Sequence, residues 1–128
     1  MTKAFQNPRG TQRETLEAAG NGGAWLASIL ERLVFLKEHS LYQDGGGRIV
    51  STSPISVDLT AEQPSVILKS CIDGAGVQMR YQTTGKPVPV ATTVGGGRSG
   101  VSARFVYASG STGAKMWFLV EEKSAAAC

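Results

Sequence analysis

Two aspartates, Asp58 and Asp73, are the residues best placed for acid–base chemistry, because each stands near the end of an extended segment. A carboxylic acid whose pKa is raised in an apolar pocket can catalyse isomerisation or dehydration. The alternative is that Asp73 stabilises the turn at Gly74 through its side chain while Asp58 faces water. We favour this structural role, so we predict no catalytic residue and keep a small isomerase- or dehydratase-like enzyme as the third interpretation.

Nucleophilic catalysis and metal binding have little support in the residue types. His39 is the only histidine, and it stands near the end of a predicted helix, where a cationic side chain is favourable. The spacing of Cys71 and Cys128 does not indicate a disulfide framework, although a disulfide could join them. We expect Cys71 to be a small buried side chain and Cys128 an exposed thiol. No His or Cys pair has zinc spacing, so we expect no metal and no cofactor.

The glycine clusters divide the chain into elements and loops. Neither the triplet at 45–47 nor the one at 95–97 matches the phosphate-binding pattern GxxxxGK[ST], and neither lies between a strand and a helix start. Arg98 and Arg104 remain candidates for contacting an anion. Six aromatic residues are expected in the core or in the lining of a pocket rather than on a nucleic-acid stacking platform. They are Trp25, Phe35, Tyr42, Phe105, Tyr107 and Trp117.

Length and composition are those of one globular domain. The chain has 128 residues, of which 41% are hydrophobic and 18% charged. A scattered net charge of +3 does not favour nucleic-acid binding. No apolar run is long enough for a transmembrane helix, and MTKAFQNPRG lacks the apolar centre of a signal peptide. We therefore expect a cytoplasmic or particle-associated protein, or an excerpt of an exported one.

Helices are predicted in the first third of the chain. Residues 1–10 should be an irregular arm, because Pro8 disfavours helical geometry before it. Thr11 and Glu14 match a capping box and predict a short helix to about residue 19. A second helix should run from Trp25 to near Leu41. Its apolar residues recur at spacings of three and four: Trp25, Leu26, Ile29, Leu30, Leu33 and Leu36.

Extended segments follow. We predict strands at 48–59, 66–72, 77–82, 101–107 and 116–120, with a long loop at 83–100. Pro54 places the first strand at a sheet edge or at a bulge, and the apolar start of the second makes it central. Along 101–107, alternate residues share one face.

Helices followed by strands with short turns indicate an α+β domain with a curved, mainly antiparallel sheet packed on N-terminal helices. We assign residues 11–122 to this domain and 123–128 to a polar tail.

Residues 16–122 resemble the nuclear transport factor 2 (NTF2-like) superfamily, in particular the small domains of many actinobacterial exported or lipid-anchored proteins. The matching segments are FLKEHSLYQDG (35–45), SVDLTAEQPSVILKSCIDG (56–74), GKPVP (85–89) and KMWFLVEE (115–122). The resemblance implies a cone with a pocket at its wide end, where enzymes of the superfamily place an acid or a histidine and many relatives only bind.

This resemblance also implies a long N-terminal helix in the cone wall, which residues 1–10 do not supply. We expect the missing wall to come from a partner, a second copy or an upstream segment. The leading interpretation is therefore a non-catalytic binding or assembly domain that acts through protein–protein contacts or through an apolar ligand in the cone. The alternative is a structural component of a multi-protein particle, such as a phage or conjugation machine.

Overall fold

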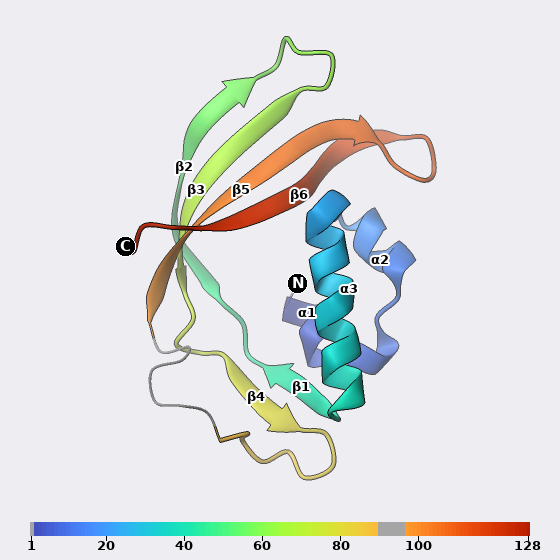
Figure 1. Cartoon of the computed structure of the whole chain (residues 1–128), viewed down its shortest axis with the longest axis vertical. Helices are drawn as coiled ribbons and strands as arrows, with labels where there is room; N and C mark the ends of the chain where they lie inside the picture. Colours follow the sequence, from blue (N-terminus) through green and yellow to red (C-terminus); the bar gives the residue numbers. More distant parts are fainter. Residues whose placement is uncertain (1, 90–96) are drawn as a thin grey trace.

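The helices come first in the chain and the strands follow (Figure 1), in a computed structural model that describes residues 2–89 and 97–128. The helical elements are α1 (Thr2–Gln6), the 3-10 turn η1 (Pro8–Gly10), α2 (Arg13–Ala18) and α3 (Gly23–Glu38). The strands are β1 (Leu41–Asp44), β2 (Arg48–Asp58), β3 (Ser65–Asp73), β4 (Gln78–Tyr81), β5 (Arg98–Ser109) and β6 (Lys115–Ala125). All four pairings between the described strands are antiparallel, and the predicted α+β fold is confirmed.

The helix α3 forms around one apolar stripe, as its spacing predicted. Its buried residues are Leu26, Ile29, Leu33 and Leu36. The helix ends at Glu38, because Ser40 adopts a φ of 52° in the left-handed region that terminates many helices. Glycine usually takes that position, so the sequence did not indicate the turn there, and the predicted end near Leu41 is three residues too late.

The N-terminal segment is helical, so the prediction of an irregular arm is wrong. The Asn7 side chain caps η1, with the Gly10 amide donating to its Oδ1 over 3.2 Å. The Thr11 hydroxyl donates to the Asn7 carbonyl oxygen over 2.8 Å, which closes the preceding turn. The predicted capping box is therefore absent, and α2 begins after Gln12 without a side-chain cap.

The main cluster of buried side chains lies among the helices, and a smaller buried group, Val106 and Phe118, lies between the sheet and the start of α3. Ala4 of α1 and Leu16 of α2 pack with the buried stripe of α3. Contacts between α3 and the larger sheet run through β6 near the beginning of the helix. There the Gly22 amide donates to the Leu119 carbonyl over 3.0 Å, and the Leu119 amide donates to the Gly20 carbonyl over 2.8 Å. Most of α3 thus extends away from the sheet (Figure 1).

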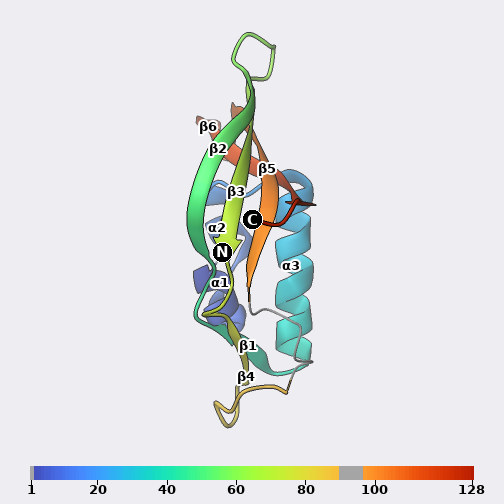
Figure 2. The same ribbon diagram turned by 90° about the vertical axis from the view of Figure 1, so that its left-hand side faces the viewer.

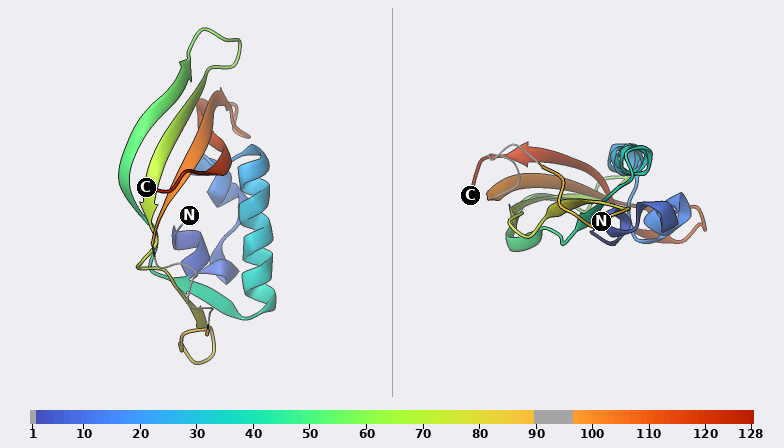
Figure 3. Two further views of the ribbon diagram at one scale, coloured as in Figure 1. Left: turned by 60° about the vertical axis from the view of Figure 1, so that its left-hand side comes forward. Right: turned by 90° about the horizontal axis from the view of Figure 1, so that it is seen from below.

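The larger sheet has the strand order β2-β3-β5-β6. Figure 2 shows β2 along one edge, and Figure 3 shows the strands in this order with α3 beyond β6. The predicted edge position of β2 is confirmed, as are its bulge, which lies between Pro54 and Ser56, and the central place of β3. The sheet is curved and does not close into a barrel.

Three further stretches differ from the predictions. Residues 41–44 form β1, which pairs with β4 in a separate two-stranded sheet, and an ion pair of 2.7 Å joins Asp44 to Arg80 across it. The strand β6 continues to Ala125, three residues into the predicted tail. The predicted loop at 83–100 already contains the start of β5 at Arg98, and its residues 90–96, with Gly95 and Gly96, lie outside the described residues.

Candidate functional site

The two candidate acids lie at opposite ends of one hairpin. Asp58 is opposite Ser65, whereas Asp73 is opposite Arg48, and the eight residue-to-residue steps of β3 from Ser65 to Asp73 span about 26 Å. Asp58 Oδ1 accepts hydrogen bonds from the amides of Thr60 (3.2 Å) and Ala61 (3.1 Å). Both carboxylates therefore stabilise turns, and they are too far apart to act as a pair.

The electrostatics of Asp73 also favour a structural role. The hydrogen bond from the Ala75 amide (3.0 Å) and the guanidinium groups of Arg48 and Arg98 lower the pKa of this carboxyl. A general acid at neutral pH needs the opposite change, a raised pKa. Asp73 thus has the environment of a turn-capping carboxylate.

The two candidate anion-binding arginines do not converge. Arg98 is opposite Asp73, and Arg104 lies six residues further along β5, about 20 Å away. The side chain of Arg104 is exposed on the sheet, in a row with Ile67 and Glu121. These positions do not form one site for an anion.

The six candidate aromatic residues lie in four separate places. Phe35 is 48% exposed and stacks on His39, with ring centroids 4.3 Å apart. Tyr42 is part of β1. Tyr107 and Trp117 contact edge to face on the larger sheet, 5.4 Å apart, and Phe105 lies on the same sheet face. They do not line one common cavity.

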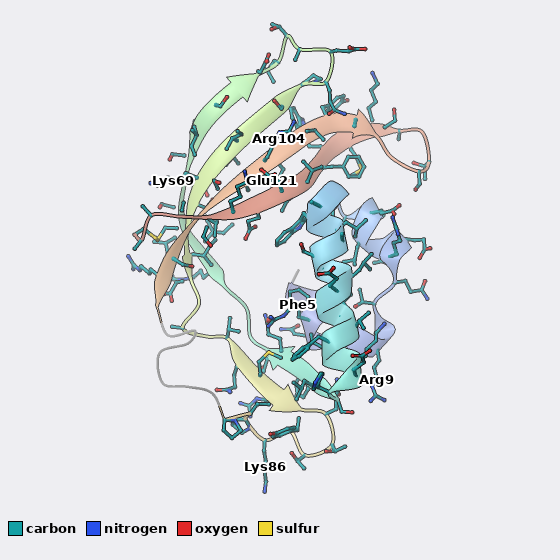
Figure 4. The ribbon with its side chains drawn as sticks, viewed as in Figure 1. Phe5, Arg9, Lys69, Lys86, Arg104 and Glu121 are labelled. Atoms are coloured by element: carbon teal, nitrogen blue, oxygen red, sulfur yellow. A yellow bond between two sulfur atoms is a disulfide. The ribbon has the colours of Figure 1, made fainter. Side chains whose placement is uncertain are left out.

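Trp25 lines a cavity of about 290 Å³ between α1, α3 and β1. Its indole Nε1 donates to Asn21 Oδ1 over 3.0 Å. The Arg32 guanidinium lies over the Phe5 ring, 5.7 Å from its centroid, and both side chains contribute to the wall. Figure 4 shows Phe5 beside α3. The contact between Arg32 and Phe5 is a weak cation–π interaction at an open surface.

His39 follows the last turn of α3, with Nδ1 2.9 Å from the Phe35 carbonyl oxygen, so its position is that of a helix-end residue. Among residues 2–89 and 97–128, no three His, Cys, Asp or Glu side chains gather as metal ligands would. None of the described helices combines the length and the apolar character needed to cross a membrane.

Cys71 and Cys128 form a disulfide, which corrects the prediction of an exposed thiol at Cys128. Cys71 itself is buried, as predicted. The chain reaches it by crossing over Gly100, where a Cβ atom would collide with the Ala126 carbonyl oxygen. The end of the chain is therefore fixed across one face of the sheet, and spacing alone did not show that β6 would lead it there.

The pairing register divides the larger sheet into two unlike faces. Residues directly opposite each other on neighbouring strands share a face, and the next row along the strands lies on the other face. One row, Val57, Val66, Phe105 and Leu119, is apolar across all four strands. The adjacent row is polar apart from one residue. It consists of Ser56, Ile67, Arg104 and Glu121.

We call the first of these surfaces the apolar face. Its central members are Pro54, Val57, Val66, Leu68, Ala103, Phe105, Tyr107, Trp117 and Leu119. The other is the charged face, which carries Lys69, Arg104 and Glu121 (Figure 4) and, toward α3, the buried Val106 and Phe118. The predicted sharing of one face by alternate residues of 101–107 is confirmed.

The apolar face is open to solvent. Val57 is 57% exposed, Trp117 39% and Tyr107 36%, while Val66, Leu68 and Phe105 are half-buried by their neighbours in the sheet. Among the described elements, the helix that contacts this sheet does so through Phe118 and Val120, on the charged-face side. An amphipathic sheet normally buries its apolar side, and here that side is the uncovered one.

Glu122 is the single charged residue in the central rows of the apolar face, in the row with Pro54, Leu68 and Ala103. Its side chain still reaches solvent, but desolvation by the surrounding structure raises the pKa of its carboxyl. The apolar face is therefore nearly free of charge.

Comparison with known proteins adds a likeness of fold. No protein-family model matches the chain, and no curated protein matches it. Among solved structures, the chain is similar to the intermembrane space region of the chloroplast protein ARC6, with a TM-score of 0.57 and 13% sequence identity. The match covers 98% of this chain and 85% of that one. At this identity the likeness concerns the fold alone.

Proposed function

We propose that the chain is a non-catalytic binding or assembly domain and that a protein partner, which can be a second copy of the chain, covers its apolar face. The observation that supports this proposal is the uninterrupted apolar row from Val57 to Leu119 on a side of the sheet that its own helices leave open. Contiguous exposed apolar patches of this kind mark interaction surfaces in soluble proteins.

The size of the patch fits a protein partner. Four strands about 4.8 Å apart and the seven residues from Val101 to Tyr107 give an area of about 20 Å by 20 Å. Covering about 400 Å² of apolar surface contributes about 10 kcal/mol before the entropy of association is subtracted. This contribution is comparable to the cost of association, which is about 4–15 kcal/mol.

The other predicted modes have less support. Described cavities of about 290–380 Å³ are at the lower end of the range for ligand pockets and are open, which favours a protein over a small apolar ligand. The enzyme interpretation loses its motivation, since Asp58 and Asp73 both serve turns. Membership of the nuclear transport factor 2 superfamily stays a prediction.

The size of the native assembly tests the proposal. In cells of the source organism, the unmodified chain should migrate in a complex larger than its own 13.4 kDa. Replacing Val57, Tyr107 and Trp117 by serine should release the folded chain, whereas Lys69→Ser on the charged face should not. A free chain in every case would refute the proposal, and a very large regular assembly would favour the particle component over a small complex.

A further inference from the structure

The proposed function leaves open what covers the apolar face. We infer that the occupant is a second copy of this chain, packed sheet against sheet about a twofold axis. This inference rests on the proposed function and names its partner. Charge, the condition of the sheet edge and the available area support it.

Charge limits the choice of partner. In the central rows of the apolar face only Glu122 is an acidic or basic residue, and it belongs to the last strand, β6. The surface therefore offers no charge pattern that an oppositely charged partner could recognise. It fits a neutral, apolar and sheet-like surface, and the same face of a second copy has these properties without like charges facing each other at its centre.

The exposed edge of the sheet is poorly suited to the other common way of joining sheets, the addition of a strand. β2 carries Pro54, which lacks an amide hydrogen, and register shifts between Ile49 and Ser51 and between Pro54 and Ser56. Prolines and bulges on edge strands protect against edge-to-edge pairing. Association through the face is therefore favoured over association through the edge.

The area of the face is sufficient for a dimer. The whole side of the sheet measures nine residues of β3 by four strands, about 600 Å², which includes the apolar centre of about 400 Å² and the mainly polar rows beside it. Two such faces in contact bury about 1,200 Å², which reaches the lower limit for stable interfaces. Two sheets of this kind pack with their strands within about 30° of each other, and their side chains interdigitate.

Sedimentation velocity of the purified oxidised protein tests the inference, with two neighbouring positions as a matched pair. Val57 and Ser56 are both exposed residues of β2, but they face opposite sides of the sheet. We expect the unmodified chain and Ser56→Lys to sediment as dimers of twice 13.4 kDa. Val57→Lys places two unpaired charges in the interface and should raise the dissociation constant by about 100-fold or more.

Circular dichroism checks that the variants fold, and Trp117→Lys on the opposite edge strand provides a second disruption if Val57→Lys does not. Binding of a fluorescent apolar dye separates the remaining outcomes. If the chain is a monomer whose dye binding is lost in Val57→Lys but kept in Ser56→Lys, the inference of a second copy is overturned and the proposed function stands. A monomer whose dye binding ignores both substitutions overturns both, and a dimer equally stable in both variants overturns the inferred interface.

Discussion

Breaking the disulfide between Cys71 and Cys128 is expected to lower the free energy of unfolding by about 4 kcal/mol. The bond joins residues 57 positions apart, and closing a loop of that length in the unfolded chain removes conformational entropy worth about 4 kcal/mol at 25 °C. Domains of this size are stabilised by only about 5–15 kcal/mol in total. The bond should therefore supply a large share of the stability.

Urea unfolding of the oxidised chain and of Cys128→Ser measures this contribution. Cys128 is the better position because it is exposed, whereas a change at the buried Cys71 would also disturb packing. With a slope of about 2 kcal/mol per molar urea, the midpoint should fall by about 2 M. Both proteins are compared at the same concentration, because dimer formation adds to apparent stability.

Reductant provides the control for this experiment. Reduced unmodified chain should unfold at the same urea concentration as Cys128→Ser, and the variant should not respond to reductant. Equal midpoints for the oxidised chain and the variant would refute the reasoning. That result would mean that fixing the end of the chain across the sheet contributes nothing to stability.

Three further predictions concern single residues. Glu122 has a raised pKa in the folded chain, so its unfavourable effect on stability grows as pH rises through that pKa. Urea unfolding across pH should therefore show that Glu122→Gln is more stable than the parent at neutral pH and equal to it in acid. Asp73 has a lowered pKa, so the stability it contributes is lost as pH falls through its pKa in the folded chain. In the same titration, the free energy of unfolding of Asp73→Asn should fall less steeply at acid pH than that of the parent, and an equal fall would contradict this. Gly100→Ala should displace the chain end at Ala126 and reduce disulfide formation, measured by thiol alkylation and mass; full oxidation at the parent rate would contradict it.

The parts of the fold that the sequence predicted are those governed by local pattern. The spacing of apolar residues in α3 predicted its buried face. Pro54 predicted an edge position or a bulge, because a missing amide has a direct consequence for pairing, and the strand has both. Ser40 shows the limit of that approach. Its left-handed backbone ends α3 early and frees residues 41–44 to form β1, and a serine carries no local signal for this conformation.

The candidate site depended on register, which the sequence predicted only in part. Alternation along 101–107 indicated one shared face, but the rows across the sheet also depend on where β2 and β6 shift register. In β6 the shift lies between Leu119, which pairs with Phe105, and Glu121, which pairs with Arg104. The disulfide could not be predicted from the sequence for a similar reason. Only the path of β6 past Gly100 brings the end of the chain to Cys71, and spacing contains no information on that path.

Photo-crosslinking from the two sides of β2 tests most directly whether the apolar face is the working surface. Benzoylphenylalanine would replace Val57 in one protein and Ser56 in another, so that the same probe reports from the apolar face and from the charged face. Irradiation of the purified protein should give a product of twice 13.4 kDa from position 57 and little from position 56. Equal yields from both positions, or none from position 57 either alone or in cells of the source organism, would contradict the account.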